Sequence, residues 1–93
     1  MANVTLKLVA IFTDDVGLTY INYDNVDTLG EIINQFMDQY GRKIRKSFVD
    51  SQGKLENHAI ILVNGRNHLF LDGLDTKLRD GDEIVLSPPI VGG

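Results

Sequence analysis

One amphipathic segment limits the fold more than any other feature of this 93-residue chain. From Leu29 to Tyr40 the apolar residues recur at the i, i+3, i+4, i+7 spacing of a helix with one apolar face. Thr28 and Glu31 have capping-box spacing, so Thr28 is the predicted N-cap, and Gly41 stands where a C-cap glycine is common. A single helix of this kind needs one face of a sheet to cover.

The rest of the chain has the patterns of short strands. Period-two alternation and turn residues predict strands over residues 4–12, 18–23, 59–63, 67–71 and 83–87. Residues 14–17 are expected to form a tight turn, and Asn64-Gly65 predicts a type I′ hairpin turn. Residues 42–57 are predicted as a connection that packs some apolar side chains on the core. With the first and last strands parallel in the middle, this order gives an α+β fold, a β-grasp with a mixed sheet of four to five strands on one main helix.

Charge and composition exclude several classes of function. Nine basic and thirteen acidic residues give a net charge of −4, which disfavours nucleic acid as the main partner. Without cysteine there is no disulfide and no thiol nucleophile, and His58 and His68 lack the spacing of a zinc site. No apolar run approaches the roughly 20 residues that span a bilayer, so the chain is expected to be cytoplasmic with no membrane partner.

The last six residues suggest a chemical role. Residues 1–87 are predicted to form the domain and residues 88–93 an extended tail, because Pro88 and Pro89 end strand pairing and favour polyproline II. Six extended residues span on the order of 20 Å. The residues predicted to thread into a partner are Pro88, Pro89, Ile90, Val91 and Gly92.

Gly93 is the predicted reacting residue of this tail. Neither Gly92 nor Gly93 has a Cβ, so the strip can pass through a narrow channel. The pKa of a terminal α-carboxyl group is about 3.5, so the group is ionised at pH 7 and can attack the α-phosphate of ATP without a base of its own. The alternative is a plain flexible end.

Two surfaces are candidate partner interfaces. Ala59–Val63 is apolar on both faces, so either the 42–57 connection covers the second face or an apolar patch is exposed there. The residues predicted for that patch are Val9, Ile11, Ile60, Leu62 and Val85. Asp80 and Asp82 belong to an acidic cluster, which is either a solvated surface or a docking site for basic residues of a partner.

Four stretches of the second half resemble a known family. Residues 63–67 (VNGRN), 74–78 (LDTKL), 80–84 (DGDEI) and 88–93 (PPIVGG) are similar to the MoaD/ThiS ubiquitin-like sulfur carriers, most of all to archaeal MoaD-like small modifier proteins. Over residues 4–40 the resemblance is one of topology. One departure is that residues 11–15 are expected to lead directly into a turn, where MoaD proteins have an aromatic-Ala segment and a longer loop.

The resemblance implies a reaction sequence and its partners. A ubiquitin-activating-type adenylating enzyme (MoeB/ThiF-like) would use ATP to adenylate Gly93, and a persulfide would convert the terminus to a thiocarboxylate. A molybdopterin synthase large subunit (MoaE-like) would then take the sulfur for molybdenum or tungsten cofactor biosynthesis. Alternatively, the terminus would be joined to a target-protein lysine, or the chain would be a ubiquitin-like binding module without chemistry. No cofactor is expected to be bound by the chain itself.

Overall fold

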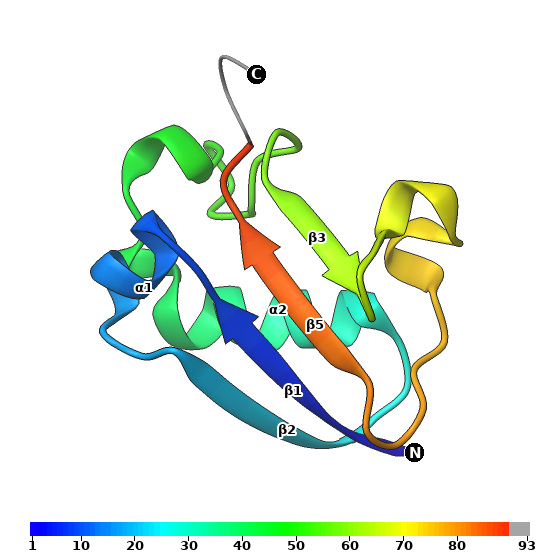
Figure 1. The fold of residues 1–93 in the computed structure, drawn as a ribbon. Helices are drawn as coiled ribbons and strands as arrows, with labels where there is room; N and C mark the ends of the chain where they lie inside the picture. The colour runs from blue at the N-terminus through cyan, green and yellow to red at the C-terminus, as the bar shows by residue number, and fades with distance from the viewer. Residues whose placement is uncertain (90–93) are drawn as a thin grey trace.

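The computed structural model describes residues 1–89, which form one mixed sheet covered on one side by a helix (Figure 1). The elements are β1 (Ala2–Leu8), α1 (Ile11–Val16), β2 (Tyr20–Val26), α2 (Leu29–Tyr40), β3 (Ile60–Val63), β4 (Arg66–Asn67) and β5 (Glu83–Ser87), with short 3-10 turns between them. The strand order is β2-β1-β5-β3-β4, and β1 and β5 run parallel in its middle while the other pairs are antiparallel. The predicted β-grasp fold is confirmed.

Helix α2 has the predicted bounds and the predicted N-terminal cap. The Glu31 amide donates to Thr28 Oγ1 at 3.4 Å, and the Asp27 amide donates to Glu31 Oε2 at 3.1 Å. In a standard capping box Glu31 would accept from the amide of the N-cap Thr28, but here it accepts from the amide of the preceding residue, Asp27. At the other end Gly41 is the C-cap, as predicted. It has φ −56° and ψ −31°, a right-handed conformation, and the chain continues into the 3-10 turn η1 (Gly41–Lys43).

The apolar face of α2 packs on the inward-facing residues of the central strands. Leu6 and Leu8 of β1 and Ile84 and Leu86 of β5 are all buried, with exposed fractions of 1% or less. Burial of this apolar area is the main source of stability, at roughly 25 cal/mol per Å². The connection 42–57 adds to the same core, as predicted. Its buried or core-packed side chains are Ile44, Phe48, Val49 and Leu55.

The predicted first strand is too long. Strand β1 ends at Leu8, and Ala10 takes φ +53° and ψ −127°, which breaks the extended chain. Helix α1 follows in place of the predicted tight turn and places the Phe12 ring 4.9 Å from the Phe48 ring in an edge-on contact. Burial of Phe12 is thus achieved from a helix, whereas the alternating pattern predicted it from a strand. Strand β2 accordingly starts later than predicted.

The second hairpin is confirmed at its turn and shorter than predicted at its return strand. Asn64 and Gly65 have φ values of +50° and +85°, as a type I′ turn requires. Strand β4 contains only Arg66 and Asn67, and the chain then forms the 3-10 turns η3 (His68–Phe70) and η4 (Gly73–Asp75). The Asn67 side chain accepts a hydrogen bond from the Leu69 amide at 3.0 Å, and this local bond competes with a continued strand.

Candidate functional site

Strand β5 brings the chain to the predicted tail from the middle of the sheet. It pairs with β1 through Val85 and Leu86, and with β3 up to the pair Ile60–Ser87. Ile84 and Leu86 have no exposed area. A strand that is paired on both sides and buried on one face resists local unfolding, so the residues just before the predicted tail are firmly held.

Residues Ser87–Pro89 are named here the tail root. The Ser87 hydroxyl donates a hydrogen bond to the Pro88 carbonyl at 2.9 Å, and both prolines are half-buried. A proline has no N–H for a strand ladder and a fixed φ, so pairing ends here and the direction of the chain is restricted. The predicted reacting residue Gly93 and the threading residues Ile90, Val91 and Gly92 lie outside the described residues.

Helix α1 and the chain leading into β3 flank the tail root. Figure 1 shows the end of β5 between these two segments. The Val9 amide donates to the Leu86 carbonyl at 3.3 Å, which extends the contact between the first and last strands by one residue before α1 begins. Thr13 Oγ1 donates to the Leu8 carbonyl at 2.8 Å and holds the first turn of α1 against the end of β1.

The sheet face opposite α2 carries the predicted apolar patch. Strand register places Tyr20, Lys7, Val85 and Leu62 in one row across four strands, and Ile60 lies beside this row. This set is named the open sheet face, and it faces the viewer in Figure 1. Ile60, Leu62 and Val85 are half-buried, and Lys7 Nζ lies 5.9 Å from the centre of the Tyr20 ring.

The second face of the apolar run 59–63 was predicted either to be covered by the 42–57 connection or to be exposed as an apolar patch. The connection's buried side chains, Ile44 and Phe48, belong to the core cluster together with Ala59, Ile61 and Val63. Ile60 and Leu62 alternate with these residues and lie outside that cluster. The connection therefore shares a cluster only with the inner side of β3, and Ile60 and Leu62 on the outer side stay half-buried. That a partner binds there stays a prediction.

Two other predicted patch residues lie elsewhere. Val9 is half-buried at the end of β1, next to the tail root. Ile11 belongs to α1 and packs against the core, so its assignment to an exposed strand face is wrong. The cause is the change from strand to helix after Leu8, which ends the alternation of faces.

Asp80 and Asp82 lie at the other end of β5 and have structural partners. Asp80 Oδ1 accepts from the Asn3 amide at 2.8 Å. Asp82 accepts from Asn64 Nδ2 and from the Arg79 amide, each at 2.8 Å. Strand β5 separates them from the tail root by roughly 17 Å at about 3.3 Å per residue. The structure thus does not bring these carboxylates together with the tail root.

An ion pair between α1 and the segment that follows α2 was not predicted from the sequence. Arg45 Nη2 and Nε donate to the two carboxylate oxygens of Asp15 at 2.8 and 2.9 Å, and the Arg45 amide donates to Asp15 Oδ2 at 3.0 Å. The side-chain and backbone hydrogen bonds from Arg45 lower the pKa of Asp15 to about 2. The pair joins α1 to the turn η2 (Lys46–Phe48) and so supports one flank of the tail root. No local sequence signal links residues this far apart.

Two negative findings apply to residues 1–89. Within this part of the chain no three His, Cys, Asp or Glu side chains are grouped as metal ligands. The longest helix there, α2, falls short of the length and apolar character needed to cross a bilayer.

Comparisons with known proteins agree with this architecture. A sequence model of the ThiS family matches residues 9–93. Small archaeal modifier protein 3 of Haloferax volcanii is 32% identical over 90 residues, which cover 95% of this chain and 96% of that protein. The sulfur carrier protein CysO of Mycobacterium tuberculosis is 33% identical over 92 residues, covering 98% of this chain and 99% of CysO.

A solved structure extends the likeness to three dimensions. The solution structure of small archaeal modifier protein 1 from Methanosarcina acetivorans superimposes with a TM-score of 0.82 and 28% identity, covering 100% of this chain and 98% of that one. The two proteins therefore share the β-grasp fold. The chain belongs to the ThiS family, the family of sulfur carriers and ubiquitin-like small modifiers that its sequence resembles.

Proposed function

We propose that the chain carries sulfur on its C-terminus, with the carboxylate of Gly93 as the group that is activated. The observation that supports this most is the position of the tail root, which continues directly from the central strand β5 and contains two prolines that end strand pairing. A tail held this way can enter the active site of another protein while the domain stays outside. Membership of the ThiS family supports the same role.

The first step of the proposed reaction is adenylation. A carboxylate oxygen of Gly93 attacks the α-phosphorus of ATP bound by a partner enzyme, the bond to the β-phosphate oxygen breaks, and pyrophosphate leaves. The product is an acyl-adenylate at the C-terminus. The described residues of this chain supply no base to this step, and an ionised carboxylate needs none.

The second step exchanges oxygen for sulfur. The terminal sulfur of an enzyme persulfide attacks the acyl carbon, and AMP leaves with the oxygen that bridged it. A thiol then reduces the sulfur–sulfur bond, so that the terminus keeps one sulfur as a thiocarboxylate and the enzyme forms a disulfide. The adenylate is reactive because AMP is a good leaving group, and charge on the phosphates is neutralised by the partner's metal and basic groups.

The proposed acceptor of the sulfur is a pterin precursor, with this chain as the small subunit of molybdopterin synthase. Its partners would be a MoeB/ThiF-like adenylating enzyme and a MoaE-like large subunit. Residues 11–16 form α1, where the sequence predicted a strand end and a tight turn over residues 14–17.

Conjugation to lysine is the second candidate. The similarity to Small archaeal modifier protein 3 over nearly the whole of both chains favours it. It would use the same adenylate, but an amine nitrogen rather than sulfur would form the final bond to the Gly93 carbonyl carbon. The adenylation of Gly93 is therefore common to both candidates, and the steps after it differ.

The open sheet face is the proposed contact with these enzymes. Ile60 is paired with Ser87 at the tail root, and Leu62 and Val85 are neighbours across the strands. A partner that covers this face would receive the tail from its edge. An apolar centre of this kind is typical of the buried core of protein interfaces.

Intact-mass measurement tests the proposed first and second steps. The full chain is incubated with ATP and the adenylating enzyme of its host, with and without a persulfide donor. We expect a mass increase for the acyl-adenylate, followed by the exchange of one oxygen for sulfur. A chain lacking Gly93 should keep the melting temperature of the wild type and show neither product. No mass change with an enzyme that is active on its other substrates would contradict the proposal.

The acceptor is tested separately. Cells that express a tagged chain are searched for peptides with Gly93 joined to lysine, and for loss of molybdopterin when the gene is deleted. Loss of molybdopterin without isopeptides supports the synthase role. Isopeptides without loss of molybdopterin support the modifier role.

A further inference from the structure

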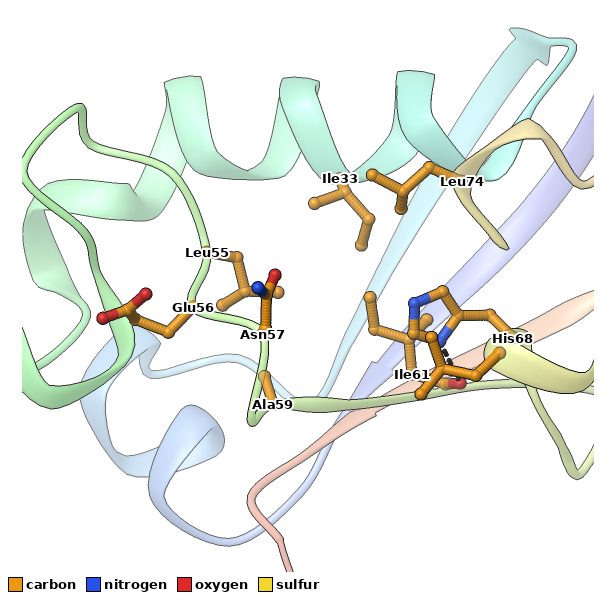
Figure 2. Close-up of a pocket in the computed structure, with 9 residues that line it drawn as sticks. Ile33, Leu55, Glu56, Asn57, Ala59, Ile61, His68 and Leu74 are labelled. Atoms are coloured by element: carbon orange, nitrogen blue, oxygen red, sulfur yellow. Dashed lines mark hydrogen bonds between the residues drawn. The ribbon is translucent and has the colours of Figure 1, made fainter. Parts of the chain in front are cut away.

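A second surface of the molecule is an apolar groove between α2 and β3, on the opposite side of β3 from the open sheet face. It encloses about 420 Å³ and is lined mainly by apolar side chains (Figure 2). The residues used in the argument below are Ile33, Leu55, Ala59, Ile61, His68 and Leu74. We propose that this groove binds an apolar segment of a partner protein that also carries lysine or arginine residues.

The floor of the groove is apolar and already formed. Ile33 of α2 and Ile61 of β3 are exposed by only 6% and 4%, and Ala59 by 5%. Figure 2 shows Leu55 on one wall and His68 and Leu74 on the other, with the Ile61 side chain between them. The ring of His68 is held because its Nδ1 lies 3.3 Å from the Ile61 carbonyl oxygen. A ligand would therefore meet a fixed apolar surface, as preformed binding sites usually present.

The rim of the groove exposes more apolar area. Leu69 is 71% exposed, Phe70 87% and Leu74 48%, and all three lie on the turns η3 and η4. Single exposed apolar residues are ordinary, but three on adjacent turns beside an apolar groove form a patch. Leu69 lines the groove, whereas Phe70 is not among its lining residues. A small molecule inside the groove would therefore leave Phe70 in water, whereas a polypeptide segment could cover it as well.

The charges around the groove indicate the character of that segment. Glu56 lines the groove, and Asp50 lines the adjoining hollow together with Lys54. Asp72 and Asp75 lie on either side of Gly73-Leu74 at the turn η4, and Lys77 follows two residues later. Lys77 is already paired with Asp27, with Nζ and Oδ2 2.8 Å apart. The margin is therefore acidic, and it complements basic residues that flank an apolar sequence.

The groove is separate from the surface proposed for the adenylating enzyme. Ile61 points into the groove and is buried, while its neighbours Ile60 and Leu62 are half-buried on the open sheet face. The alternation of side chains along β3 thus places two apolar surfaces on opposite sides of one strand. A partner in the groove could be held while the tail is being activated, and the inference does not depend on the chemistry of Gly93.

A synthetic peptide of alternating isoleucine and threonine, with lysines at both ends, is the probe for this site. The uniformly ¹⁵N-labelled full chain is titrated with it and amide chemical shifts are followed. We expect the shifts to concentrate in residues 55–61 and 68–75. The double variant Leu69→Ser, Leu74→Ser should fold, since both side chains lie outside the core cluster, and should bind about tenfold more weakly. Leu18→Ser, which removes a leucine 41% exposed, is the matched control and should bind as the wild type does.

A second peptide tests the charge. With glutamates in place of the lysines, binding at low salt should be weaker by about tenfold, and added salt should reduce that difference. The double variant Glu56→Gln, Asp75→Asn removes only charge at the margin of the groove. It should bind the lysine peptide more weakly than the wild type, and this test does not depend on whether the serine variant folds.

Three results would overturn the inference. One is binding that shifts only residues of the open sheet face. Another is that the wild type binds the lysine and glutamate peptides with equal affinity, or that both double variants bind the lysine peptide as tightly as the wild type does. The third is a set of shifts at residues 55–61 and 68–75 that depends on protein concentration without peptide, because the occupant would then be a second copy of the chain.

Discussion

Arg45 donates hydrogen bonds to Asp15 from three nitrogen atoms, and this contact fixes α1 to the segment that follows α2. The Asp15 side chain is only 15% exposed, while that of Arg45 is 45% exposed. A bidentate pair with a low exposed fraction on the carboxylate side holds its geometry better than an ordinary surface pair. The flank of the tail root thus depends on two residues that are 30 positions apart.

The first prediction concerns the pH dependence of this pair. The pKa of Asp15 is about 2 in the folded chain and 3.8 in its ordinary state, so the folded state favours the ionised form. Its stabilisation is therefore present above about pH 4 and is lost as the pH falls toward 2. Asp15→Asn should lower the melting temperature at pH 7, and the difference from wild type should vanish near pH 2. Asp24→Asn, an exposed carboxylate of β2, is the control. A difference that persists unchanged at pH 2 would refute the role of ionisation.

The second prediction concerns backbone strain at Ala10. Its φ of +53° with ψ −127° is a conformation that residues with a Cβ rarely adopt. Ala10→Gly should raise the free energy of unfolding by about 1 kcal/mol, because relief of strain exceeds the entropy cost of glycine. Chemical denaturation measures it.

The matched control for Ala10 is the reverse change at Gly17. That residue has φ +85° and open space where a Cβ would lie, so Gly17→Ala adds strain without a clash. It should lower stability by about 1 kcal/mol. If both variants change stability in the same direction, left-handed strain is not the cause.

The third prediction concerns Tyr23, which is 4% exposed and whose hydroxyl donates to Gln39 Oε1 at 3.0 Å. Burial raises the pKa of Tyr23 to about 12, and the nearby Tyr40 adds to the shift. As the pH rises, Tyr23 ionises in the unfolded chain before it ionises in the folded one. The stability due to this group is therefore complete below pH 10 and declines as the pH rises toward 12. Tyr23→Phe should remove the last component of the phenolate absorbance titration and cost about 1 kcal/mol at pH 7. Tyr20→Phe, at a side chain 54% exposed, should leave that late component in place.

The fourth prediction concerns the open sheet face. Leu62→Ser should raise the KM of the adenylating enzyme for this chain by about tenfold with little change in kcat, since the residue contributes to binding and not to chemistry. Its melting temperature should stay close to that of the wild type because Leu62 lies outside the core cluster. Leu18→Ser, at an exposed leucine outside the face, is the control. An unchanged KM would exclude this face as the contact with that enzyme.

Local sequence rules determined several elements of this protein. The apolar spacing of α2, the cap at Thr28 and the two positive φ angles at Asn64-Gly65 each depend on residues within one or two turns of chain. The same holds for the end of β5 at Ser87, since proline cannot donate to a ladder. These features could be predicted because short-range sterics and hydrogen bonding decide them.

Other features required the folded chain. The run from Val9 to Phe12 fits a strand and a short helix equally well, and contact between Phe12 and Phe48 accompanies the helix. The exposure of Leu62 and the shape of the groove over Ile61 depend on where residues 42–57 and 68–75 come to lie. The Asp15–Arg45 pair has no local signal at all.

The sequence by itself therefore determined the order of the main elements and a diglycine terminus after two prolines. Tertiary structure decided that the strand before the tail root is central in the sheet, that Ile60, Leu62 and Val85 share a face of that sheet, and that Asp80 and Asp82 lie at the other end of β5 from the tail root. The physical reason is that local rules fix single segments, whereas the neighbours of a residue are set by packing between segments far apart in the chain.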